Sequence, residues 1–73
     1  MAGIAIPKPS FLDNCEYLGV FHKIKRWRSK DGKRLYTWDS LHGEIEVYNL
    51  RGKHLAVYSP QGVQIKDALK GGK

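Results

Sequence analysis

Three carboxylates and one imidazole lie within eight residues of this chain, at Asp39, His42, Glu44 and Glu46. Carboxyl and imidazole groups are the side chains that most often transfer protons in enzymes. A surface that only held phosphate groups would not carry three anions, because each anion repels the phosphates that it must approach. The cluster therefore predicts general acid–base chemistry, with metal ligation and plain solvated strand positions as the alternatives.

Seven cations lie just before this cluster, and aromatic residues are interleaved with them. Cations contact phosphates and aromatic rings stack on unpaired bases, so the segment predicts RNA binding. The alternative is a solvated hairpin edge whose lysines prevent pairing with other sheets. The residues that we expect to contact RNA here are Lys23, Lys25, Arg26, Trp27, Arg28, Lys33, Arg34, Tyr36 and Trp38.

Cleavage of RNA would need little more than these groups, because the ribose 2′-hydroxyl is the nucleophile. The enzyme supplies a base for the hydroxyl proton, an acid for the leaving 5′-oxygen and cations for the phosphorane charge. Glu46 as the base and His42 as the acid fit these roles, since nearby carboxylates favour the protonated imidazole. This mechanism requires no metal or other cofactor, and it excludes DNA, which lacks the hydroxyl. His22 and His54 have weaker claims to a catalytic role, and we expect cross-strand polar packing for His54.

The composition limits the architecture that can position these groups. A chain of 73 residues forms one domain at most, and its net charge of +6 favours a polyanionic partner. Its single cysteine, Cys15, excludes an internal disulfide and reads as a small buried hydrophobe. We interpret residues 1–9 as a lead segment without an export signal and residues 10–73 as the domain. No segment has the apolar length or the amphipathic pattern that is typical of membrane binding.

The expected fold is α+β and mostly β. Ser10 and Asp13 predict the start of a short N-terminal helix, and Phe11, Cys15 and Leu18 form the apolar stripe of that helix over residues 11–18. Glycines at positions 32, 43, 52 and 62 predict the turns of an antiparallel meander. We expect four to five short strands, at 22–28, 33–38, 44–48, 54–58 and 63–65, with the helix packed on the sheet.

One run of residues resembles a known family. This run is Trp38-Asp39-Ser40-Leu41-His42-Gly43-Glu44-Ile45-Glu46-Val47-Tyr48, and it is preceded by Lys25-Arg26-Trp27 and by Asp31-Gly32-Lys33-Arg34-Leu35-Tyr36. With these two preceding segments, it resembles the cytotoxic ribonuclease domain of the ribosome-inactivating colicins. Related domains end some contact-dependent inhibition toxins. The resemblance covers about residues 23–65. It implies a strongly twisted sheet and metal-independent cleavage of 16S ribosomal RNA at the decoding site, which blocks translation.

The resemblance also implies residue roles and partners. Glu46 matches the general base, His42 the general acid, Asp39 a carboxylate that assists this histidine and Glu44 a supporting acid. The family's C-terminal catalytic arginine has no counterpart here, which leaves Lys66 or Arg51 as the substitute cation. The resemblance further implies that the domain is part of a larger secreted toxin, acts in the cytoplasm of the target bacterium and is a monomer when free. The implied partner is an acidic immunity protein.

Two other functions stay open at this point. A non-catalytic basic RNA-binding β module would bind RNA in a salt-dependent manner and leave it uncut. A metal-dependent nuclease would use Asp39, His42 and the two glutamates as ligands, and EDTA would abolish its activity.

Overall fold

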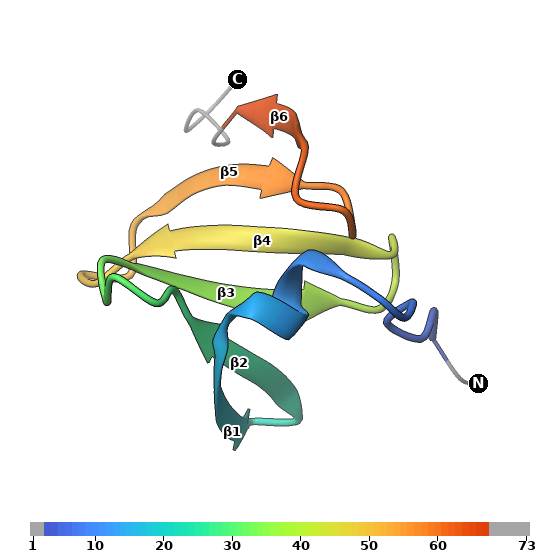
Figure 1. The fold of residues 1–73 in the computed structure, drawn as a ribbon, viewed down its shortest axis with the longest axis horizontal. Coiled ribbons are helices and arrows are strands. Elements are labelled where there is room, and N and C mark those ends of the chain that lie inside the picture. Colours follow the sequence, from blue (N-terminus) through green and yellow to red (C-terminus); the bar gives the residue numbers. More distant parts are fainter. Residues whose placement is uncertain (1–2, 68–73) are drawn as a thin grey trace.

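The computed structural model describes residues 3–67, which form one antiparallel sheet of six strands in chain order (Figure 1). The strands are β1 (Glu16–Phe21), β2 (Ile24–Arg28), β3 (Arg34–Asp39), β4 (Glu44–Asn49), β5 (His54–Tyr58) and β6 (Gln64–Asp67). Each strand pairs with the next one, as the regular spacing of the glycines predicted. In the described part of the chain, no helix has the length and apolar character needed to cross a membrane.

The prediction of an N-terminal helix over residues 11–18 is wrong. A single 3-10 turn, η1 (Phe11–Asn14), forms instead, and the chain then enters β1, so the sheet has six strands rather than four or five. Ser10 and Asp13 do cap this turn, since each side chain accepts a backbone hydrogen bond there. Helices shorter than about 12–15 residues are marginal in water. Residues 16–21 pair with β2 instead, with one irregularity between Tyr17 and Gly19.

The core lies between η1 and one face of the sheet, which we call the core face. Ile45 and Val47 of β4 are fully buried, and Leu12 of η1 is 3% exposed. The Phe11 ring packs edge-on against the ring of Tyr36 with the centroids 5.2 Å apart. Cys15 packs against the same cluster, and burial raises the pKa of its thiol despite the opposing charge of Lys30. This agrees with the prediction that Cys15 acts as a hydrophobe.

The opposite side of the sheet, the outer face, carries the acidic side chains. Successive side chains of a strand point to opposite faces, so Glu44 and Glu46 project away from Ile45 and the core. In the β3–β4 register, Asp39 lies opposite Glu44 and Thr37 lies opposite Glu46. Directly paired residues share a face, and the carboxylates of both strands therefore gather on the outer face.

Gly62, in the turn between β5 and β6, offers a test of this packing. Its φ is +90°, and a Cβ there would lie 2.6 Å from Cδ1 of Phe11. Gly62→Ala should lower the free energy of unfolding by about 2–5 kcal/mol, from left-handed backbone strain plus overpacking. Gly52→Ala is the matched control, because Gly52 has a φ of +87° and open space around it. Urea denaturation should show a clearly smaller loss for Gly52→Ala, and equal losses would contradict the packing.

Candidate active site

The turn after β3 fixes one acid–imidazole pair. The Asp39 carboxylate accepts backbone hydrogen bonds from Leu41 at 3.0 Å and from His42 at 3.2 Å. Its second oxygen lies 2.7 Å from Nδ1 of the His42 ring. Gly43 then takes a φ of +68°, which lets the chain enter β4. The local sequence Asp-Ser-Leu-His-Gly is therefore sufficient to hold the imidazole against the carboxylate.

The charge of Asp39 decides which nitrogen of His42 is available. Burial alone would raise the pKa of Asp39. Hydrogen bonds from the ring and backbone of His42 and the backbone of Leu41, together with the charge of the ring, outweigh burial, so the pKa of Asp39 is lowered. At neutral pH the carboxylate is therefore ionised and only accepts, so Nδ1 must donate. The exchangeable proton of His42 then belongs to Nε2, and the side chain is 61% exposed. This geometry suits a general acid.

A second acid–imidazole pair joins β4 and β5. Nε2 of His54 lies 2.6 Å from Oε1 of Glu46, and the two side chains are only 19% and 23% exposed. The β4–β5 ladder shifts register between Val47 and Tyr48, and this irregularity sets His54 beside Glu46. The expected cross-strand polar packing of His54 agrees with this contact. Its direct pairing with Glu46 is the feature that the sequence analysis missed, because a bulge leaves no clear signal in the sequence.

Glu44 links these pairs to the last strand. One nitrogen or oxygen atom from each of Asp39, His42 and Glu44 lies within 4.8 Å of the others, so the three groups converge. Nζ of Lys66 in β6 lies 3.5 Å from Glu44. Of the two proposed substitute cations, Lys66 is therefore at the cluster, whereas Arg51 follows β4 at the opposite end of the sheet. The same three groups could also coordinate a divalent cation.

A row of paired residues across the outer face puts a cation on each side of Glu46. Glu46 is paired with Thr37 in β3 and with Val57 in β5. Thr37 is in turn paired with Arg26 in β2, and Val57 with Lys66 in β6. The Arg26 guanidinium lies 5.3 Å from the centre of the Phe21 ring, and its Nε is buried with no hydrogen-bond partner in residues 3–67. A hollow of about 290 Å³ opens beside this row and is lined by Arg26, Thr37 and Tyr48. Phosphate oxygens could enter it close to Glu46.

Two of the aromatic residues expected to stack on bases belong to the core instead. Trp27 is 8% exposed and Tyr36 is 4% exposed. They pair with each other across β2 and β3 and occupy core-face positions of the alternation, so their rings are not free for a base on the outer face. This burial argues against base stacking by these two rings on the outer face. Trp38 is half-buried against the same cluster.

The basic residues do not form one surface. Lys23 and Lys25 line a hollow on the core-face side, while Arg26 lies on the outer face. Arg28 forms an exposed ion pair with Glu16 at 2.7 Å. Lys33 and Arg34 lie at the end of β3 remote from Asp39, where Arg34 donates to the Tyr58 hydroxyl at 3.3 Å. Strand alternation thus divides the basic segment between two faces and one end of the sheet.

Asp39→Asn should change the acid stability of the domain. A lowered folded-state pKa means that the stabilisation by Asp39 is complete above its ordinary pKa of 3.8 and is lost as the pH falls through the lower folded value. Chemical denaturation from pH 7 to pH 2 should therefore show a stability gap between wild type and Asp39→Asn that closes at low pH. Glu16→Gln, which removes an exposed ion pair, serves as the control. A gap for Asp39→Asn that does not depend on pH would contradict this prediction.

The fold and the site thus define a basic antiparallel β domain with two acid–imidazole pairs on one face of its sheet. Residues 18–73 match the family described as Cytotoxic, and the chain belongs to this family of colicin cytotoxic ribonuclease domains. The family resemblance seen in the sequence is thus confirmed.

Three curated relatives from Escherichia coli are similar to this chain in alignments of 46 residues that cover 60% of the chain. Colicin E3 is 46% identical, Colicin-E6 is 44% identical and Cloacin is 41% identical. The chain spans about 8% of the length of each of these relatives.

Proposed function

We propose that this domain is a metal-independent endoribonuclease that cleaves 16S ribosomal RNA at the decoding site and so blocks translation. The observation that carries the proposal is the pair of acid–imidazole contacts, Asp39–His42 and Glu46–His54, on one face of the sheet, with a cation on each side of Glu46. A domain that only bound RNA would gain nothing from three carboxylates on that face.

In this mechanism, Glu46 removes the proton of the ribose 2′-hydroxyl, and the oxygen attacks the adjacent phosphorus. His42 gives its Nε2 proton to the departing 5′-oxygen, which leaves a 2′,3′-cyclic phosphate and a free 5′-hydroxyl. His54 positions the Glu46 carboxylate, and Asp39 holds the proton on Nδ1 of His42.

Two cations are placed to counter the charge that builds on the phosphorane. Lys66 offers a single ammonium group, whereas the guanidinium of Arg26 can make paired hydrogen bonds to two phosphate oxygens. We assign the stabilisation of the phosphorane charge to these two residues, which lie on opposite sides of Glu46. Charge stabilisation of this kind contributes several kcal/mol in other enzymes, about 2.7–4 kcal/mol for one donor.

The setting of the domain follows from the same proposal. The domain would reach the cytoplasm of a target bacterium as part of a larger secreted toxin and would act there as a monomer. A cognate immunity protein with an acidic surface would bind it in the producing cell, because opposite charges on the two partners accelerate association with a +6 domain.

Incubation of the domain with purified ribosomes in excess EDTA tests the reaction type. We expect one discrete cut in 16S ribosomal RNA, mapped by primer extension, at the same rate with and without EDTA. Loss of cleavage in EDTA would overturn the mechanism in favour of a metal ion held by Asp39, His42 and Glu44, which converge in the structure. Salt-dependent binding without any cleavage would favour the non-catalytic RNA-binding module.

A further inference from the structure

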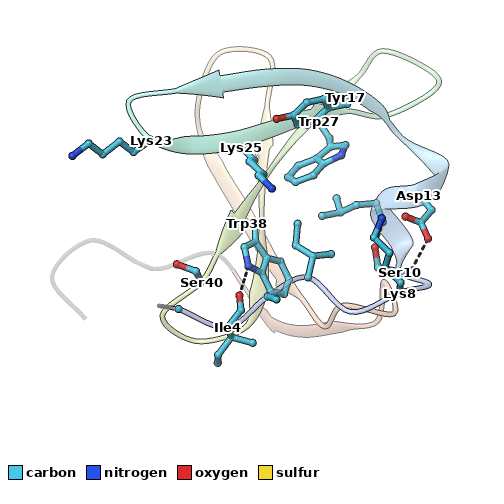
Figure 2. Close-up of a pocket in the computed structure, with 14 residues that line it drawn as sticks. Ile4, Lys8, Ser10, Asp13, Tyr17, Lys23, Lys25, Trp27, Trp38 and Ser40 are labelled. Atoms are coloured by element: carbon cyan, nitrogen blue, oxygen red, sulfur yellow. Dashed lines mark hydrogen bonds between the residues drawn. The ribbon is translucent and has the colours of Figure 1, made fainter. Parts of the chain in front are cut away.

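A second hollow, with a volume of about 670 Å³, lies on the core-face side of the sheet (Figure 2). The N-terminal segment and η1 form one wall, and the β1–β2 hairpin with the end of β3 forms the other. We call this hollow the aromatic cleft, because Tyr17, Trp27 and Trp38 line it. Its size falls in the range of ligand sites, about 300–1,000 Å³.

The aromatic rings of the cleft are held in place. The Trp38 indole donates from Nε1 to the carbonyl of Ile4 at 2.8 Å, a contact drawn in Figure 2. The Tyr17 and Trp27 rings lie 5.3 Å apart at an angle of 53°. Trp27 is almost fully buried, while Tyr17 is 52% exposed and Trp38 is half-buried. The cleft therefore presents rigid aromatic surface to solvent, which suits stacking of a planar ligand.

The charge of the cleft is positive. Lys8, Lys23 and Lys25 line it, and none of the ion pairs within residues 3–67 involves them. The one acid among the lining residues, Asp13, already accepts a hydrogen bond from the backbone of Ser10 at 2.9 Å. Ammonium groups around aromatic rings match a ligand that combines anionic groups with planar rings, and single-stranded RNA has both in every nucleotide.

The hairpin that carries Lys23 adopts an unfavourable backbone conformation. His22 and Lys23 connect β1 to β2 with φ values of 52° and 68°, although neither is a glycine. Asn-Gly and Asp-Gly are the sequences that this kind of turn prefers. Strain of this kind persists where the surrounding structure over-determines it, and it clusters at active sites and ligand sites. Here it places the ammonium group of Lys23 among the lining of the cleft.

The cleft adjoins the catalytic face at one point. Ser40 lines the cleft, and the preceding residue, Asp39, belongs to the acid–imidazole cluster on the outer face. An RNA strand that crosses the turn after β3 could therefore occupy both places. Much of the cleft is built by residues 3–17, which precede the residues 18–73 that match the family.

We infer that the aromatic cleft binds an unpaired segment of the substrate RNA next to the cleaved bond. A base stacks against Tyr17 and Trp38, and the flanking phosphates contact Lys23 and Lys25. This inference rests on the proposed function, which supplies the RNA. The two sites act on one strand from opposite sides of the sheet.

The tryptophans allow a direct test, because both tryptophans of the chain line the cleft. The test uses the Glu46→Gln variant, which should leave the RNA intact, and titrates it with a single-stranded oligoribonucleotide and with a duplex of the same sequence. We expect saturable quenching of tryptophan fluorescence by the single strand, and markedly weaker quenching by the duplex, whose bases are already stacked.

Variants of the two lysines separate binding from folding. Lys25→Ala should weaken the quenching and reduce the slope of log affinity against log salt by about 0.7. Lys23→Gly should raise the stability of the domain, because it relieves a positive φ, and still weaken RNA binding. A purely structural role for Lys23 would predict no loss of binding. Lys53→Ala, which removes one charge from the turn at the other end of the sheet, should leave the quenching unchanged.

Three results would overturn the inference. The first is a lack of quenching by the single strand, and the second is equal binding by the Lys23, Lys25 and Lys53 variants. The third is quenching by an acidic peptide as strong as the quenching by RNA, which would indicate a protein partner. Failure of the proposed function is distinguishable, since wild-type protein would then leave ribosomes uncut while the Glu46→Gln variant still bound the single strand in the cleft.

Discussion

Glu46→Gln should lower the single-turnover rate of ribosomal RNA cleavage by about 10²–10⁴-fold. The amide cannot take the proton of the 2′-hydroxyl, yet it keeps the size of the carboxylate. It can also still accept a hydrogen bond from His54, whose Nε2 lies 2.6 Å from Oε1 of Glu46 in the wild type. The fold should therefore survive the change, and a circular dichroism spectrum and a urea transition will show whether it does. His42→Ala should cause a loss of similar size, because the leaving 5′-oxygen would depart without its proton.

Glu16→Gln is the matched control, since Glu16 is a carboxylate in an exposed ion pair with Arg28. If Glu46→Gln cut ribosomes as fast as Glu16→Gln, the assignment of the base would be wrong.

Ile45→Ala should lower the free energy of unfolding by about 2–5 kcal/mol. Ile45 is fully buried at the centre of the sheet, and its neighbours in β4 are Glu44 and Glu46. Native domains have a stability of about 0.05–0.15 kcal/mol per residue, which gives about 4–11 kcal/mol for a chain of 73 residues. The substitution therefore removes a large share of the total, and urea denaturation will measure it.

The nearby Leu41 provides the control for Ile45. It is 78% exposed, so Leu41→Ala should change the stability by less than about 0.5 kcal/mol. Ile45→Val, which removes one methylene group, should cost about 0.5–1.5 kcal/mol. A loss for Ile45→Ala as small as that for Leu41→Ala would show that the β4 side chains do not form the centre of the core.

Much of the site could be read from the sequence because its order is local. Glu44 and Glu46 are separated by one residue, and the alternation of a strand places both on one face whatever the rest of the fold does. Asp39 and His42 meet within a single turn, since an aspartate caps its own backbone two and three residues further on. The glycine spacing predicted the turns for the same reason, as a positive φ is a property of one residue.

Contacts between segments that are distant in the sequence were decided only by the tertiary structure. Residues 11–18 have an apolar stripe that suits a helix, but from Glu16 onward the chain pairs with β2 and forms a strand instead. The shift in the β4–β5 register set His54 against Glu46. Closure of the N-terminal segment over the core face buried Trp27 and created the aromatic cleft. Short-range spacing thus determined which groups could do chemistry, while strand pairing and burial, which depend on the whole chain, determined their partners.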